Sequence, residues 1–592
     1  MKRAPLSHDS AMISRLFFRL LPVQAAIIAM GSINSIVDGI VAARFIDAAT
    51  VGVIGLYFTV LRILEAVSAI LVSGVSVLSG RSLGAGDVER TRGICSLGFT
   101  VALLVGAAMT LAGLLAPGLI AELLGAKRAL RDDLLTYVIG NAIGIVPNLL
   151  SQQLTLNLQM ERQDRLGQIG IFVMIAVNVT LDMLFVGVLD MGIWGLALAT
   201  SLANWAYFLV LVSYYFTGKA QLTPNPARAL WDVLPDLLKT GFPNGLLVGC
   251  LAAKSLVLNR ILITYSGQDS LSALAAYNMA NAFLLSIALG SGAVVRMLSS
   301  ILFGEENREG LLALCRVVMT RVMAVILIIT GAVVLLSPYL ARIYFPDTAS
   351  ATFEMTRQLF VIQGACLPVM YTCIVYSGYY QATERRLFMT LISVTDGFLS
   401  VVIPALILAP RLGALGVWLA TPIGGAITLT LCVLYPAFQL RRWPRGADEW
   451  LLLPARFGEG ERLVLTLRSM DEVTLTADKV QSFCAAHGVQ PRNAHCAGLC
   501  LEEMAGNIVR HGFRADRHSH IIELCVLIQT GGGVMLRIKD DCAPFNPQEW
   551  HDMAHSDDPG RNMGIRLVYG LADRVEYQNL LGLNVLTVLL AG

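Results

Sequence analysis

Charged residues are scarce in this 592-residue sequence: they make up 15% of it, against 55% hydrophobic residues, and mean hydropathy is +0.65. This balance excludes an ordinary soluble protein. The eleven cysteines include no CxxC pair, and six lie in or beside apolar runs, so we predict reduced packing cysteines and no disulfide framework. No cleavable signal peptide is expected, because the first long apolar run is much longer than a signal core.

The charged residues that are present divide the chain into two parts. From Ala447 onward there are 13 Lys and Arg against 19 Asp and Glu, and all the histidines except His8 lie there. The first 440 residues contain twelve apolar segments, each long enough to cross a bilayer as a helix. We therefore predict a multi-pass α-helical membrane part and a soluble tail. The predicted spans are residues 13–43, 48–78, 93–118, 133–158, 166–189, 192–217, 235–265, 270–302, 311–337, 354–380, 387–409 and 413–438.

The sequence of the membrane part indicates an internal duplication. Several landmarks return after 220 or 221 residues: Pro22 as Pro243, Tyr57 as Tyr277, Gly84 as Gly304 and Gly192 as Gly413. This predicts two six-helix bundles, residues 1–220 and 221–440, with a solute path between them. A linker over residues 441–460 and a separate domain over 461–592 complete the predicted organisation.

Basic residues indicate how the membrane part is oriented. One set of alternate loops holds nineteen Lys and Arg, and the opposite set holds six. Cytoplasmic loops carry the excess of positive charge. We therefore predict that both termini and the tail domain lie in the cytoplasm.

Four features of the membrane part recur together in one known family. They are Pro22, Val37-Asp38 in the first helix, the turn at Gly84 and Asn178-x-x-x-Asp182. Over about residues 10–440 the chain thereby resembles the multidrug and toxic-compound extrusion (MATE) transporters. The resemblance implies two bundles that rock about a central cavity in the bacterial inner membrane. Such a protein exchanges H⁺ or Na⁺ for an organic solute, in contact with membrane lipid.

Ionisable groups inside the membrane are the main candidates for transport residues, because each costs about 2.5–3.5 kcal/mol on insertion scales. The resemblance implies an ion-coupling carboxylate at Asp38, and Asn34 shares its helix face four residues earlier. Asn178 and Asp182 repeat this spacing on the fifth helix. The alternative for each pair is a structural hydrogen bond between helices.

The seventh helix departs from the MATE pattern, because it carries Lys254 where many members place a Glu. Lys254 either pairs with Asp396 from another helix, or faces the cavity and attracts anionic cargo. The second alternative would favour a flippase of lipid-linked substrates. Arg62 and Glu65, three residues apart on the second helix, are expected to pair with each other.

The tail is expected to be an α+β sandwich of one sheet and a helical layer. Leucines alternate with other residues over 463–468, which predicts a half-buried strand. Further strands are expected at about 520–529, 533–540 and 583–589, and helices at about 473–487, 492–511 and 563–572.

Three places in the tail carry polar residues suited to chemistry. Glu503, Asn507 and His511 recur every four residues and so line one helix face. Asp540 ends a strand. A glycine turn then leads through Gly564 into a helix, where backbone N–H groups could meet a phosphate.

This order resembles the ATP-binding fold of sensor histidine kinases, Hsp90 chaperones and, most closely, anti-sigma-factor serine kinases, over about residues 460–590. The resemblance implies that Asn507 is a Mg²⁺ ligand and that Glu503 polarises an attacking water or hydroxyl. Asp540 would hydrogen-bond the adenine amino group of ATP, and Gly564 would lie against the phosphates. His511, on the same helix face as Asn507, is also expected to bind the nucleotide.

The tail also departs from that family. Cys542 replaces a usual glycine and would crowd the base, and Arg561 and Asn562 replace glycines of the phosphate lid. Two histidine pairs, His518 with His520 and His551 with His555, could bind a metal, but exposed loop histidines are the expectation for both.

The leading hypothesis is an ion-coupled exporter whose tail binds ATP and regulates transport. The rival is a membrane-tethered serine/threonine kinase or switch that acts on a small protein of the anti-sigma-antagonist type. No nucleic-acid partner is expected.

Overall fold

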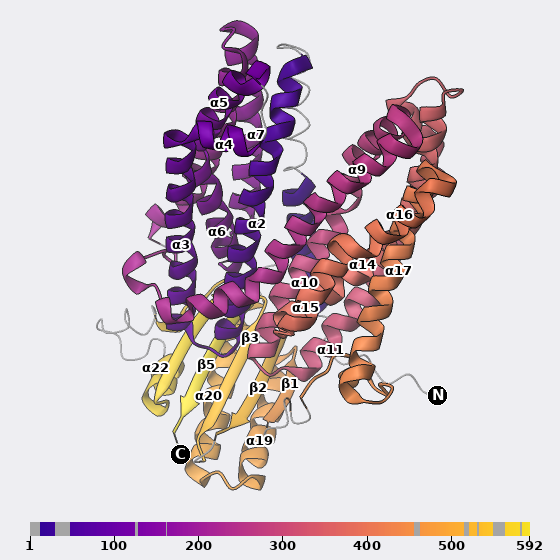
Figure 1. The fold of residues 1–592 in the computed structure, drawn as a ribbon. Helices are drawn as coiled ribbons and strands as arrows, with labels where there is room; N and C mark the ends of the chain where they lie inside the picture. Colours follow the sequence, from indigo (N-terminus) through magenta and orange to yellow (C-terminus); the bar gives the residue numbers. More distant parts are fainter. Residues whose placement is uncertain are drawn as a thin grey trace. The chain divides into compact units, whose positions relative to one another are not determined.

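The computed structural model describes most of the chain and divides it into two compact units. Residues Phe17–Leu158 and Gln163–Leu453 form one, here the membrane unit, and Met1–Leu16, Gln159–Arg162 and Pro454–Gly592 form the other, the tail unit (Figure 1). The described residues are 12–29, 48–124, 128–161, 163–218, 220–454, 457, 462–513, 520–529, 532–548, 563–580 and 583–591.

Helices make up the membrane unit, as predicted. Among the described residues, eleven are long and apolar enough to span a bilayer, or twelve if the bent pair Arg131–Ala142 and Ile145–Met160 is one span. After a first helix at Met12–Ala29 come α2 (Ala48–Gly84), α3 (Val88–Leu115), α4 (Pro117–Leu123), α5 (Arg128–Ala142), α6 (Ile145–Met160), α7 (Asp164–Asp182), the π-helical turn η1 (Met183–Val188) and α8 (Gly192–Ser213). The second half contains α9 (Leu234–Leu284), α10 (Ser286–Gly304), α11 (Arg308–Val317), η5 (Val318–Val322), α12 (Met323–Leu335), α13 (Ser337–Tyr344), α14 (Ala351–Ala382), α15 (Arg386–Val394), η6 (Thr395–Leu399), α16 (Ser400–Leu412) and α17 (Ala414–Leu440).

The seventh and eighth predicted spans are joined in α9. Gly267 breaks this helix with a φ of 75°, in the left-handed region that glycine enters without a steric penalty. The break falls in the loop predicted between residues 265 and 270. Residues 268–304, the rest of α9 together with α10, therefore correspond to α2 at an offset of 220.

The two halves meet at a reciprocal glycine contact between α2 and α10. A Cβ added at Gly84 would collide with the carbonyl oxygen of Ile301, and one added at Gly304 would collide with that of Arg81. Gly304 lies 220 residues after Gly84, and Ile301 lies 220 residues after Arg81. The glycine of each half therefore packs on the equivalent carbonyl of the other half. Such reciprocity is what two repeats related by a pseudo-two-fold axis would show.

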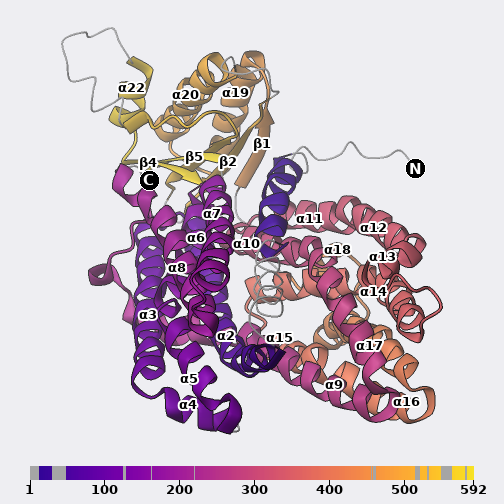
Figure 2. The same cartoon turned by 90° about the horizontal axis from the view of Figure 1, so that it is seen from above.

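The tail unit is a five-stranded antiparallel sheet in the order β1-β2-β3-β5-β4, with α19 and α20 on one face (Figure 2). This confirms the predicted α+β class. The sequence reading missed β4, a strand with Arg, Glu, Gln and Asn among its seven residues. The elements are β1 (Arg462–Leu467), α19 (Met470–Ala486), α20 (Pro491–Asn507), the π-helical turn η7 (Ile508–Gly512), β2 (Ile522–Ile528), β3 (Val534–Asp540), α22 (Met563–Leu571), β4 (Arg574–Leu580) and β5 (Leu583–Leu590).

Part of the predicted linker, residues 441–460, belongs to the membrane unit. Helix α18 (Ala447–Trp450) is held there by the ion pair of Asp448 with Arg308. The Tyr379 hydroxyl donates to the carbonyl oxygen of Leu451 at 2.8 Å, and the Leu451 side chain is buried.

Candidate functional sites

A buried amide–carboxylate pair ends α7. The Asn178 Nδ2 donates to Asp182 Oδ2 at 2.8 Å, and both side chains have no exposed surface. The π-helical turn η1 begins at the next residue, and single π-helical turns within helices are frequent at functional sites. The structure thus places Asn178 and Asp182 inside the helical bundle. Asn34 and Asp38 lie outside the described residues.

Lys254 on α9 lies beside the π-helical turn η6. A Cβ added at Gly397 would lie 2.6 Å from the Cys250 Cβ, and Cys250 is one helical turn before Lys254. Asp396 directly precedes Gly397, so Lys254 and Asp396 lie on two elements that pack together. The two alternatives for Lys254 stay predictions. On α2 the predicted Arg62–Glu65 pair is confirmed, with 2.6 Å between Nη1 and Oε2.

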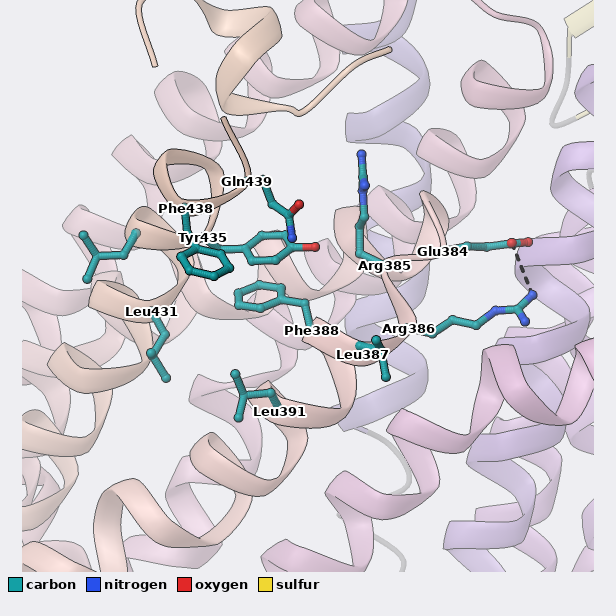
Figure 3. A pocket seen from close by; sticks show the side chains of 11 residues that line it. Glu384, Arg385, Arg386, Leu387, Phe388, Leu391, Leu431, Tyr435, Phe438 and Gln439 are labelled. Atoms are coloured by element: carbon teal, nitrogen blue, oxygen red, sulfur yellow. Dashed lines mark hydrogen bonds and ion pairs between the residues drawn. The ribbon is translucent and has the colours of Figure 1, made fainter. Parts of the chain in front are cut away.

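The membrane unit also contains a pocket of about 620 Å³ between α15 and α17 (Figure 3). The rings of Phe388 and Tyr435 stack within it, with centroids 3.7 Å apart. Leucines line one part of it, and Glu384, which is bonded to Arg386, lies at another. The pocket could not be predicted from the sequence, because the residues that line it come from two segments about 45 residues apart.

In the tail unit, Asp540 is buried at the end of β3 and held by hydrogen bonds from Asn584 and Cys542. Its Oδ1 accepts from Asn584 Nδ2 at 2.7 Å and from the Cys542 backbone N–H at 3.0 Å. Burial raises the pKa of the Asp540 carboxyl, and the hydrogen bonds from Asn584 and from the backbone and side chain of Cys542 act in the opposite direction. The result is a carboxylate in a fixed orientation, as recognition of an amino group requires.

Asn584 is the side-chain partner of Asp540, and no role of its own was predicted for it from the sequence. The register pairs it directly with Asp540 across β3 and β5. Besides donating to Asp540, it accepts from the Tyr577 hydroxyl at 2.7 Å and from Asn579 Nδ2 at 2.6 Å. Asn584 is the second residue of β5, a strand in which buried and half-buried residues alternate. A buried Asn needs hydrogen-bond partners, so its place in this alternation was a signal that the sequence offered.

Glu503 and Gly564 are brought together by the packing of α20 on α22. A Cβ added at Gly564 would collide with Glu503 Oε2, so the start of α22 faces this carboxylate. Asn507, one turn further along α20, is half-buried. The helix changes to the π form after Asn507, so exposed His511 does not follow Glu503 at the expected α-helical spacing.

These residues fit a magnesium nucleotide. Mg²⁺ takes hard oxygen ligands and keeps several waters, so the Asn507 amide oxygen can suffice as a protein ligand. Gly564 stands in the first turn of α22, where backbone N–H groups favour an anion. Asp540 has the acceptor that an adenine amino group needs. Arg561 and Asn562 lie outside the described residues.

Cys542 packs against Gly512, and the crowding of the base expected of it stays a prediction. Its side chain is buried, and its Sγ would be 2.9 Å from a Cβ added at Gly512. The thiol therefore occupies space left by Gly512 at the end of η7.

Comparison with known proteins identifies both parts. The MatE family model matches residues 25–184 and again 247–406, and a histidine kinase-like ATPase domain model matches residues 468–589. The chain belongs to the MATE family of transporters and carries a histidine kinase-like ATPase domain in its tail. It is accordingly a multi-pass membrane protein.

Two multidrug transporters align with this chain over about 390 residues. The chain is 28% identical over 393 residues to the probable multidrug resistance protein NorM of Bradyrhizobium diazoefficiens, covering 63% of this chain and 82% of that protein. It is 22% identical over 391 residues to the multidrug export protein MepA of Staphylococcus aureus, covering 64% and 84%. Among solved structures, a MATE transporter of Vibrio cholerae superposes with a TM-score of 0.66 at 16% identity, covering 73% and 98%, and shares the fold.

Proposed function

We propose that this protein is an H⁺- or Na⁺-coupled antiporter that exports a small organic solute across the bacterial inner membrane. The observation that carries the proposal is the fully buried Asn178–Asp182 pair at the end of α7. Asp182 provides a carboxylate that can take up a proton or cation, and Asn178 orients it. Asp38, with Asn34, is proposed to share this coupling role.

The nature of the cargo is proposed from the relatives and from Lys254. NorM and MepA are named as multidrug resistance and export proteins, which suggests drug-like organic solutes. Lys254 is proposed to pair with Asp396, on the neighbouring turn η6, rather than to recruit an anionic cargo. The excess of Lys and Arg in one set of loops supports cytoplasmic termini.

We propose further that the tail domain binds ATP with Mg²⁺ and regulates transport. Asp540 is proposed to hold the adenine amino group, Asn507 to ligate Mg²⁺, and Gly564 to lie against the phosphates. Glu503 would polarise a water or hydroxyl near the phosphates. The bound ion and nucleotide supply the charge and the phosphoryl group, while the chain orients them.

Transport by the full chain in proteoliposomes tests the coupling. With an imposed H⁺ or Na⁺ gradient and a fluorescent organic cation, Asp182→Asn is expected to lower gradient-driven transport at least tenfold, because the amide cannot exchange a proton or balance a cation. Asp190→Asn, at an exposed position, is the matched control and should transport normally. Equal transport by the wild type and Asp182→Asn would reject the coupling role.

A further inference from the structure

The ends of β2 and β3 bring together the side chains of His520, Asp541 and Cys542. The register pairs Ile522 with Asp540, so His520 reaches the level of Cys542 just beyond the ladder. His520 Nδ1 lies 3.1 Å from Asp541 Oδ1. The His520 nitrogen, an Asp541 oxygen and the Cys542 sulfur all lie within 4.8 Å of one another.

Two of the three residues, His520 and Cys542, are shielded from solvent, and Asp541 is half-buried. His520 is 8% exposed and Cys542 is 3% exposed, so the expectation of an exposed loop histidine at 520 is wrong. The His520 ring lies against Phe513, with centroids 5.7 Å apart. Buried polar side chains need partners, so polar groups that meet at the ends of two strands call for a specific role.

We propose that His520, Asp541 and Cys542 form a binding site for Zn²⁺. Imidazole nitrogen, carboxylate oxygen and thiolate sulfur are the three ligand types that zinc accepts. Tetrahedral zinc with bonds of about 2.0–2.3 Å places ligand atoms roughly 3.2–3.8 Å apart, so closure by about 1 Å completes the geometry. The mixture of nitrogen and sulfur selects against Mg²⁺ and Ca²⁺, which prefer oxygen.

The environment of Asp541 sets the affinity of this site. Its Oδ2 pairs with Arg15 Nη1 at 3.1 Å, and its Oδ1 also accepts from the Ile521 backbone N–H at 3.2 Å. A cation bound at Asp541 is repelled by the Arg15 guanidinium. Removal of this positive charge should therefore strengthen zinc binding.

The zinc site adjoins the proposed nucleotide site. The Cys542 backbone N–H that donates to Asp540 Oδ1 belongs to the same residue whose thiolate would hold the metal. Zinc should therefore fix the backbone that orients Asp540 and change the affinity for ATP. This consequence, unlike the metal site itself, rests on the proposed binding of nucleotide.

Zinc titration of the untagged, metal-free full chain in detergent tests the site without nucleotide. Competition with a chromophoric chelator should show one tight equivalent, with affinity at least tenfold lower in Cys542→Ser and in His520→Gln. Cys525→Ser, a thiol on β2 outside the cluster, should bind as the wild type does. Arg15→Gln should bind severalfold more tightly.

Cobalt substitution provides a readout independent of affinity. Co²⁺ should give a thiolate-to-metal charge-transfer absorption that disappears in Cys542→Ser but remains in Cys525→Ser. Zinc binding as tight in Cys542→Ser as in the wild type, or the absence of a tight equivalent in the wild type, would overturn the proposal. Because neither assay contains ATP, failure of nucleotide binding would leave this result unaffected.

Discussion

Replacing Asn584 by Ala should release the carboxylate at the base of the proposed nucleotide site. The change removes the Asn584 Nδ2 donor that lies 2.7 Å from Asp540 Oδ1. Asp540 is 3% exposed, so water has little access to replace this donor. The carboxylate would keep the backbone N–H of Cys542, which lies 3.0 Å away.

The expected loss of stability follows from the kind of bond removed. At a pH above the raised pKa of Asp540 its carboxyl group is ionised, and a hydrogen bond to such a charged group contributes about 1.5–3 kcal/mol. The neutral bonds from Tyr577 and Asn579 add less, because both residues are half-buried and water can replace Asn584 there. We therefore expect Asn584→Ala to lower the free energy of unfolding of the tail by about 2–3 kcal/mol.

Hydrogen exchange of the full chain measures this loss. A change of about 2 kcal/mol should speed the slowest amides of β3 and β5 by roughly 30-fold. Asn579→Ala is the matched control, since it removes one neutral bond to the same side chain and should cost less than about 1 kcal/mol. If Asn584→Ala exchanges no faster than Asn579→Ala, the bond to Asp540 does not carry the effect.

Two further predictions concern pH and the contact between the halves. The pKa of Asp540 is raised mainly by burial, so the folded tail favours the neutral carboxyl group. The stabilisation from this proton is fully present below the ordinary pKa of Asp. It is lost as the pH rises through the raised pKa. Denaturation of the tail across this range should show a fall in stability that Asp540→Asn flattens, and an unchanged slope would contradict it. In the membrane unit, Gly304→Ala should lower the melting temperature in detergent, because the new Cβ collides with the Arg81 carbonyl and overpacking costs about 1–3 kcal/mol. Gly331→Ala, where no atom lies within 4 Å of the new Cβ, should melt as the wild type does, and equal melting of both variants would count against a tight α2–α10 contact.

The main architecture was predictable because it depends on local patterns. Long apolar runs must form helices in lipid to satisfy their backbone, so the spans followed from hydropathy. The return of Gly84 as Gly304 predicted the duplication, and the structure adds that both glycines serve the same close contact. Strand β4 was missed because its polar residues, such as Glu576 and Gln578, do not show the apolar alternation of a half-buried strand.

The candidate sites could be predicted only in part. Glu503 and Asp540 could be selected from the sequence, because their residue type and order along the chain resemble a known nucleotide-binding fold. Their partners could not: Asn584 meets Asp540 across 44 residues. The sequence left open whether Lys254 pairs with Asp396, and the structure adds that η6 packs on α9.

Local periodicity and composition thus specify the helices, the strands and the two repeats, because each depends on neighbours a few residues away and on the surrounding solvent. Which polar groups meet depends on strand register and helix packing, and a shift of one residue in register moves a side chain to the opposite face of the sheet. The meeting of His520 with Cys542, and of Asn584 with Asp540, therefore emerged only in the folded chain.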